Sequence, residues 1–157
     1  MLIAMMAFGN PLTRSERKKN LKKFGILETF LGKFGLNSWA TLMSKIDSEF
    51  WKTKKVLVTG HTGFKGAWLI EWLHGLGANI HGFALLPENT PNLYGILKTP
   101  INSERIGNLC DFNLLEDYVL DVNPDIIFHL ASQAIVRRGY QDPLGTIQTN
   151  VLGTANL

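Results

Sequence analysis

The residues with the clearest chemical potential form a short glycine-rich loop. Three glycines recur at every third position in Gly60-His-Thr-Gly63-Phe-Lys-Gly66. Between a strand and a helix, Gly60 would allow the tight turn, Gly63 would let a pyrophosphate approach the backbone, and Gly66 would let the helix pack closely on the sheet. The helix would add free N–H groups and the positive end of its dipole. The spacing therefore predicts a binding site for the phosphates of a dinucleotide.

The loop and the strand that should follow it depart from the usual patterns in two ways. The spacing is G-x-x-G-x-x-G rather than G-x-G-x-x-G, and no Gly-Lys-Ser/Thr follows, so this is not a Walker loop. At Ala84 and Leu85, where a ribose would be held, there is neither an acid nor an arginine, and Glu88 is interpreted as a loop residue. The residues alone therefore leave NAD and NADP open.

Regular elements must flank the loop for it to bind phosphate. A β-branched run predicts a strand at Lys55–Thr59, and helical periodicity predicts a helix over Phe64–Leu76. The same alternation continues along the chain and predicts an α/β fold, an incomplete Rossmann-type doubly wound parallel sheet of about four strands. The further predicted elements are strands at Asn79–Leu85, Ile106–Cys110 and Asp125–Leu130, a helical turn at Leu93–Lys98, a helix capped by Asn113 that ends before Asn123–Pro124, and a last helix from Asp142–Pro143 to Leu157.

Composition fits a globular domain and excludes several classes of protein. The chain has 157 residues, 45% of them apolar and 18% charged, with a single cysteine. This excludes collagen-like, disulfide-stapled and mostly disordered chains. No apolar run reaches the roughly 18 residues that a membrane span needs. Cys110 has no partner for an internal disulfide, so we expect a reducing compartment, the cytoplasm.

The net charge of +3 is unevenly distributed. Residues 1–42 hold seven Lys or Arg and two acids, whereas residues 43–157 hold nine and eleven, so the two parts carry +5 and −2. We predict a basic N-terminal extension over 1–42, disordered or loosely helical, and a dinucleotide-binding domain over 43–157. An amphipathic helix on a membrane surface and a transit peptide are alternatives for the extension. Lysines without a recognisable motif give no basis for nucleic-acid binding.

Six stretches in order resemble the extended short-chain dehydrogenase/reductase superfamily of NAD-dependent epimerases and dehydratases, and within it the CDP-glucose 4,6-dehydratases. The stretches are Ser48–Lys52, Thr59–Leu69, Pro91–Leu93, His129–Gln133, Val136–Pro143 and Thr149–Thr154. The resemblance implies NAD as the cofactor, a nucleotide sugar as the substrate, and conversion of CDP-glucose to CDP-4-keto-6-deoxyglucose in the synthesis of dideoxy sugars of lipopolysaccharide. The cofactor would take a hydride from C4, water would leave across C5–C6, and the hydride would return to C6.

The resemblance also implies which residues line the cofactor. The glycine loop would hold the pyrophosphate, Asp111 and Phe112 would flank the adenine, and Thr149 would approach the nicotinamide ribose. Asp111 could instead simply cap the turn that follows it. The complete set of implied cofactor-binding residues is Gly60, Thr62, Gly63, Phe64, Lys65, Gly66, Asp111, Phe112, Leu130, Ala131, Ser132, Gln133 and Thr149.

No catalytic residue is assigned in this chain. The superfamily uses a Ser or Thr with a Tyr-x-x-x-Lys pair, in which the Lys lowers the pKa of the Tyr that accepts the substrate proton. One such string is present, Tyr94 to Lys98, but it lies between the second and third strands, away from the expected site of chemistry. We therefore expect a truncated dinucleotide-binding domain that is inactive alone. No metal site is predicted, and a homo-oligomer of a longer protein is compatible with the sequence.

Two alternative functions stay open at this point. One is a dinucleotide-binding module without catalysis, and the other is a related nucleotide-sugar epimerase or reductase. Polar residues near the predicted site also have competing interpretations. His129 is interpreted as a structural histidine and Asn150 as a residue that holds backbone, whereas Arg137 and Arg138 either bind a phosphate or form an exposed basic pair.

Overall fold

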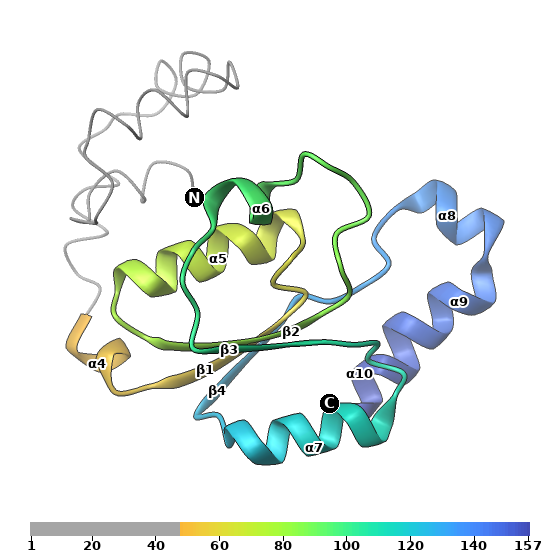
Figure 1. The fold of residues 1–157 in the computed structure, drawn as a ribbon. Helices are drawn as coiled ribbons and strands as arrows, with labels where there is room; N and C mark the ends of the chain where they lie inside the picture. Colours follow the sequence, from red (N-terminus) through yellow and green to blue (C-terminus); the bar gives the residue numbers. More distant parts are fainter. Residues whose placement is uncertain (1–47) are drawn as a thin grey trace.

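A four-stranded parallel sheet forms the centre of the structure, a computed structural model that describes residues 48–157 (Figure 1). The strands are β1 (Lys55–Thr59), β2 (Asn79–Ala84), β3 (Ser103–Ile106) and β4 (Ile126–His129). Their order is β3-β2-β1-β4, so the chain moves from β1 toward one edge and then returns to the other side of β1. This order confirms the predicted Rossmann-type sheet. The predictions for residues 1–42 lie outside the described residues.

Strand β1 is the centre of the sheet because it pairs on both sides. Val56 lies opposite Ile80 of β2 and opposite Ile126 of β4, and the register continues to Thr59. Val56, Leu57 and Val58 are fully buried. A continuous apolar run of this kind is what a strand covered on both faces requires. The predicted strand at KVLVT is therefore confirmed, and the structure shows that it is the central one.

Helices cover both faces of the sheet, which makes the fold doubly wound (Figure 1). On one face, α5 (Phe64–Gly75) packs Ile70 and Leu73 against Val56 and Val58 of β1. On the other face, α7 (Phe112–Val122) packs Leu115, Tyr118 and Val122 around Leu57 and Phe83. Alternate residues of β1 thus serve two separate cores, as the period of a strand dictates. The short helices α4 (Ser48–Lys52) and α6 (Leu93–Leu97) lie beside α5.

Polar contacts fix α7 to the sheet beneath its apolar stripe. The hydroxyl groups of Tyr118 and Ser103 are hydrogen-bonded at 2.8 Å, and the Ser103 hydroxyl also contacts Nδ1 of His81 at 2.7 Å. These two hydrogen bonds connect α7, β3 and β2. The helix ends at Asn123, whose φ of 44° places it in the left-handed region that Asn tolerates at a helix end.

The third strand lies three residues earlier than the sequence predicted. The prediction placed it at the apolar segment Ile106–Cys110, but β3 spans Ser103–Ile106 and pairs with His81–Ala84. An edge strand pairs with only one neighbour and needs no continuous apolar run. Because β3 consists mostly of polar residues, its sequence did not indicate a strand. Leu109, which suggested a strand, instead leaves the sheet and fills the core beneath it.

One prediction at a helix end was also wrong, and helices α4 and α8 were missed. The cap of α7 is Asp111 rather than Asn113, because Oδ1 of Asp111 accepts a hydrogen bond from the Leu114 N–H at 3.2 Å. Helix α8 (Val136–Gln141) was not predicted at all, since most of its side chains are exposed and its sequence has no apolar stripe. The remaining predicted strands and helices differ from the observed ones only by a residue or so at an end.

The last predicted helix is confirmed from its cap onward. Asp142 accepts a hydrogen bond from the Gly145 N–H at 2.9 Å, and Pro143 occupies the first turn, where its missing N–H costs nothing. The helical path runs through α9 (Pro143–Ile147), a π-helical turn η2 (Gln148–Leu152) and α10 (Gly153–Asn156). Across residues 48–157, no helix has the length and apolarity that spanning a membrane would demand.

Candidate functional site

The glycine loop makes a sharp turn at the carboxyl end of β1. Gly60 has a φ of +73°, a conformation that side chains disfavour, and its N–H donates to the Phe83 carbonyl at 2.8 Å. The Gly63 N–H then donates to the Gly60 carbonyl at 3.0 Å, which closes the turn. Helix α5 begins at the next residue. The strand, turn and helix that the sequence predicted around this loop are all confirmed.

The helix approaches the strand so closely that side chains would collide. A Cβ placed on Gly66 would lie 2.1 Å from the Gly60 carbonyl oxygen, and one on Gly60 would lie 2.7 Å from the Ala131 backbone nitrogen. Both contacts are with backbone, which has little room to move. Gly63 differs, because its Cβ would meet only the Gly60 oxygen, at 3.2 Å. Gly60 and Gly66 are therefore required by packing, whereas Gly63 leaves open space in front of the loop.

The amino end of α5 is open to solvent and carries no side-chain cap. Gly63 occupies the cap position and offers no side chain to the first N–H groups of the helix. Phe64 is 65% exposed, and Lys65 is exposed beside it. Unsatisfied N–H groups and the positive end of the helix dipole attract anions. The geometry and the charge at this end thus suit a phosphate or diphosphate.

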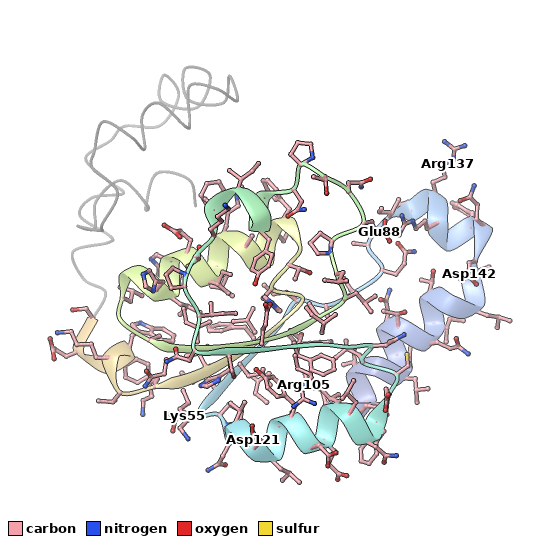
Figure 2. All side chains as sticks on the ribbon, viewed as in Figure 1. Lys55, Glu88, Arg105, Asp121, Arg137 and Asp142 are labelled. Atoms are coloured by element: carbon pink, nitrogen blue, oxygen red, sulfur yellow. The ribbon has the colours of Figure 1, made fainter. Side chains whose placement is uncertain are left out.

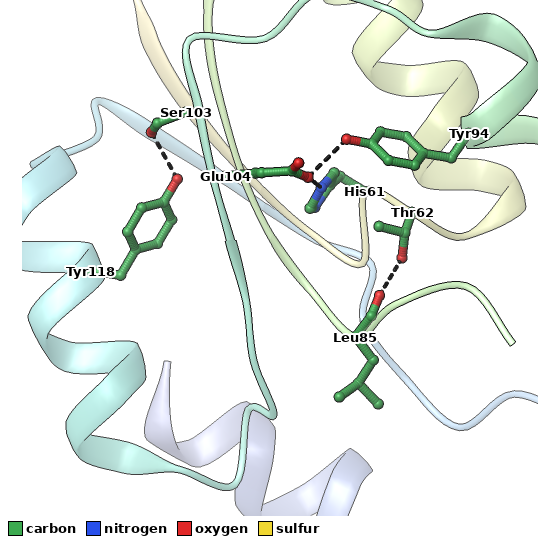
Figure 3. Close-up of polar contacts among 7 residues, drawn as sticks. All are labelled: His61, Thr62, Leu85, Tyr94, Ser103, Glu104 and Tyr118. Carbon is green, nitrogen blue, oxygen red and sulfur yellow. Dashed lines mark hydrogen bonds and ion pairs between the residues drawn. The ribbon is translucent and has the colours of Figure 1, made fainter.

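The other two loop residues face the interior, as Figure 3 shows. The Thr62 hydroxyl donates to the Leu85 carbonyl at 2.8 Å, which ties the loop to the end of β2. His61 is fully buried, and its Nε2 lies 2.9 Å from Oε2 of Glu104. The Tyr94 hydroxyl donates to the same carboxylate oxygen at 2.7 Å. Neither His61 nor Glu104 was singled out from the sequence, because they are 43 residues apart and no local pattern links them.

These contacts shift two pKa values in opposite directions. The hydrogen bond from His61 lowers the pKa of Glu104 below its ordinary value, against a smaller opposing effect of burial. Burial and the hydrogen bond to Glu104 raise the pKa of Tyr94 to about 12. A tyrosine that accepts a proton needs a lowered pKa. The pKa of Tyr94 is shifted in the opposite direction.

A buried hydroxyl joins the ends of β1 and β4. The Thr59 oxygen accepts hydrogen bonds from the backbone N–H groups of Leu130 at 3.2 Å and Ala131 at 3.3 Å. It also contacts Nδ1 of His129 at 2.7 Å, while Nε2 of His129 contacts the Thr154 hydroxyl at 3.0 Å. Both ring nitrogens of His129 therefore have partners, which confirms its interpretation as a structural histidine.

The segment after β4 is held in turn by the π-helical turn. Asn150 accepts from the Gln133 N–H at 2.8 Å and donates to the Gln133 carbonyl at 3.0 Å, so it holds backbone as the sequence suggested. Thr149, its neighbour, is half-buried. The segment 130–133 and the glycine loop thus lie together beside the carboxyl ends of the parallel strands β1 and β4, where the order in which strands are added to the sheet changes side. Ligands of open α/β sheets bind in the crevice at this point.

The remaining predicted residues lie around this edge with separate contacts. Asp111 and Phe112 start α7 just after β3, so they belong to the same carboxyl edge of the sheet, and Phe112 is 47% exposed. Arg138 forms a two-pronged ion pair with Glu88, which joins α8 to the loop after β2 and lowers the pKa of the Glu88 carboxyl. Figure 2 shows Arg137 pointing away from the domain. The two arginines thus have different environments, which the sequence did not indicate.

Comparison of the sequence with known proteins finds relatives among nucleotide-sugar dehydratases. The family described as "GDP-mannose 4,6 dehydratase" matches residues 57–157. The chain is 43% identical to CDP-glucose 4,6-dehydratase of Salmonella typhimurium over 71% of this chain and 32% of that protein. It is 32% identical to GDP-mannose 4,6-dehydratase of Yersinia enterocolitica over 66% and 30%. The chain therefore spans about a third of the length of these curated relatives.

Solved structures give the same result for the fold. The UDP-glucose 4-epimerase of Thermus thermophilus, solved in complex with NAD, matches with a TM-score of 0.57 and 27% identity, over 66% of this chain and 32% of that one. The UDP-glucose 4-epimerase of Brucella ovis, also with NAD, matches with a TM-score of 0.57 and 25% identity, over 67% and 31%.

Because α5 approaches β1 so closely, adding a single methyl group at Gly66 should strongly destabilise the fold. We expect Gly66→Ala to lower the free energy of unfolding by about 3 kcal/mol, because the methyl group overlaps a backbone carbonyl that cannot retreat. Gly139→Ala in α8 is the matched control, since its nearest neighbour would be 3.8 Å away, and it should change stability by less than about 1 kcal/mol. Urea unfolding of both variants measures this, and equal midpoints would contradict the packing role of Gly66.

The raised pKa of Tyr94 predicts a distinctive ionisation at high pH. The wild-type absorbance of tyrosinate minus that of Tyr94→Phe should stay flat through pH 10, the ordinary tyrosine value, and rise only near pH 12. Because the folded-state pKa is raised, the stability that Tyr94 contributes is full below pH 10 and is lost as the pH rises through about 12. A difference absorbance that rises at pH 10 would contradict the bond to Glu104.

Proposed function

Because the chain belongs to the GDP-mannose 4,6-dehydratase family, we propose that it is the NAD-binding portion of a nucleotide-sugar 4,6-dehydratase, a lyase that acts on CDP-glucose. The observation that carries this proposal is the uncapped amino end of α5 behind a glycine loop, in a chain 43% identical to a CDP-glucose 4,6-dehydratase. The product would be CDP-4-keto-6-deoxyglucose. Since the chain spans about a third of that relative, the activity is proposed for a longer protein.

The residues present fit a dinucleotide at this edge of the sheet. A side chain at Gly63 would project into otherwise open space before the free N–H groups of α5, which is the space that a diphosphate needs. Phe64 and Lys65 border it, and Asp111, whose Oδ1 already caps α7, keeps a second carboxylate oxygen for the adenine side. The solved relatives in complex with NAD favour NAD over NADP, since the end of β2 offers no acid or arginine to choose between them.

Each part of the chain would have a separate task. Bound NAD would supply hydride acceptance and return during dehydration. The α5 end would hold the diphosphate, and the segment of Leu130, Ala131, Ser132 and Gln133, fixed by Thr59 and Asn150, would line the remainder of the cofactor. Thr149 would border the nicotinamide ribose. These contributions are binding and orientation, and none of them moves a proton on the substrate.

A second candidate is a related nucleotide-sugar epimerase. The observation that favours it is the likeness of the fold to two UDP-glucose 4-epimerases. The higher sequence identity to the CDP-glucose dehydratase makes dehydration our first proposal. For either enzyme we propose a reducing, cytoplasmic location, consistent with the free thiol of Cys110.

The proposed function predicts that this chain binds the cofactor by itself. NAD and ADP-ribose should both bind, and Gly63→Ala should weaken each by about tenfold, because the new methyl group occupies diphosphate space. Calorimetry of the 157-residue chain measures both affinities. Leu120→Ala, at a position of α7 that is 71% exposed and outside the proposed site, should bind like the wild type. Absence of NAD binding in the wild type, or equal affinity in Gly63→Ala, would overturn the proposal.

The proposed function also predicts the outcome of an activity assay with CDP-glucose. We propose that the isolated chain does not dehydrate CDP-glucose, because the tyrosine of its Tyr-x-x-x-Lys string is bonded to Glu104 and has a raised pKa. Incubation with CDP-glucose and NAD, followed by mass spectrometry of the sugar nucleotides, should show no product. A full-length CDP-glucose 4,6-dehydratase in parallel provides the positive control. Detection of CDP-4-keto-6-deoxyglucose from the purified chain would contradict this expectation.

A further inference from the structure

The glycine loop has two faces with different partners. Its outer face, at Gly63 and the start of α5, is exposed and carries the free N–H groups. Its inner face consists of His61 and Thr62, whose side chains are buried. The inner face holds the loop on the sheet, so it determines where the outer face points.

Three different elements hold the ring of His61. It lies directly on the backbone of β2, where a Cβ at Gly82 would be 2.6 Å from Nδ1. Its Nε2 contacts Glu104 of β3 at 2.9 Å. Its plane meets the ring of Tyr94 of α6 edge-on, with 5.2 Å between the centroids. One side chain of the loop therefore connects it to β2, β3 and α6.

The carboxylate of Glu104 sets the orientation of this ring. Nδ1 of His61 is buried and has no hydrogen-bond partner among residues 48–157, so within this part of the chain the ring hydrogen-bonds through Nε2 alone. An ionised carboxylate can only accept, which makes Nε2 the nitrogen that donates. Tyr94 fixes the same carboxylate oxygen from the other side. The Glu104 side chain is 42% exposed, so its charge stays partly hydrated and is inexpensive to keep.

We propose that His61 is a positioning residue for the phosphate-binding loop, and that Glu104 and Tyr94 hold it in place. The affinity of the α5 end for a diphosphate then depends on two residues of β3 and α6 that face the inner side of the loop. This inference rests on the proposed function, because it names the device that orients the proposed cofactor site. It assigns His61, Glu104 and Tyr94 a role in binding without contact to the ligand.

The experiment compares three variants of β3 in the full 157-residue chain. Glu104→Ala removes the acceptor, and Glu104→Gln keeps an oxygen that can accept from Nε2. Ser103→Ala removes two hydrogen bonds on the opposite face of the same strand, one to Tyr118 and one to His81. The ligand is ADP-ribose, measured by calorimetry. We expect about a tenfold loss of affinity for Glu104→Ala, less than about threefold for Glu104→Gln, and none for Ser103→Ala.

A second measurement follows the loop without any ligand. Hydrogen–deuterium exchange of the peptide that contains residues 60–67 should be faster in Glu104→Ala than in the wild type and in Ser103→Ala. Because Ser103→Ala also loses partly buried hydrogen bonds, it reports what a general loss of stability does to this peptide. Faster exchange limited to Glu104→Ala, with recovery in Glu104→Gln, supports positioning by the carboxylate.

The outcomes separate this inference from the proposed function. Unchanged exchange and unchanged affinity in Glu104→Ala would overturn the positioning role while the wild type still binds ADP-ribose. Equal losses of affinity in Glu104→Ala and Ser103→Ala would also overturn it, because stability alone would then explain them. If exchange responds as expected but the wild type binds neither ADP-ribose nor NAD, the loop is held by Glu104 but the proposed cofactor site is wrong, and the role in binding falls with it.

Discussion

The approach of helix α5 to the end of β1 is the constraint on which the rest of the site depends. A Cβ at Gly66 would lie 2.1 Å from the Gly60 carbonyl oxygen, so the helix can begin where it does only because that side chain is absent. This approach brings the amino end of α5 to the carboxyl edge of the sheet. The same turn places Gly60 against the backbone of Ala131, so it also determines how closely β4 and its following segment can lie. Two close backbone contacts therefore fix where α5 and the segment after β4 lie relative to the end of β1.

Much of this arrangement is local in the sequence and was therefore predictable. The apolar run of β1, the glycine spacing and the helical stripe of α5 occupy about 20 adjacent residues, and each follows from steric rules that need no distant partner. Strand β3 was misplaced because an edge strand with the sequence Ser-Glu-Arg-Ile has no apolar pattern, and only its pairing with β2 defines it. Asp111 was considered both as a cap and as an adenine contact, and the structure establishes the cap.

The contacts that the sequence did not reveal all join distant segments. His61 and Glu104 are 43 residues apart, and Glu88 and Arg138 are 50 apart. A buried histidine needs a partner, but nothing in the sequence near His61 indicates which residue provides it. The parallel register of β2 and β3 answers that, since it brings Glu104 opposite Gly82, and Gly82 leaves space for the His61 ring. Pairing of strands thus created a polar cluster that no periodicity could predict.

The likeness to dehydratases in sequence and to epimerases in fold has one physical explanation. The constraints at Gly60 and Gly66 involve backbone atoms, so they apply to any chain that presents a helix end to a diphosphate at this edge. They shape the proposed cofactor site through backbone contacts alone, so they do not depend on which reaction the longer protein carries out. Sequences that share this fold can differ at positions whose side chains are not restricted by these backbone contacts. His61 occupies such a position, and its ring requires that residue 82 have no side chain and that residue 104 accept a hydrogen bond. Gly82, Glu104 and His61 are therefore a set whose members are explained only together.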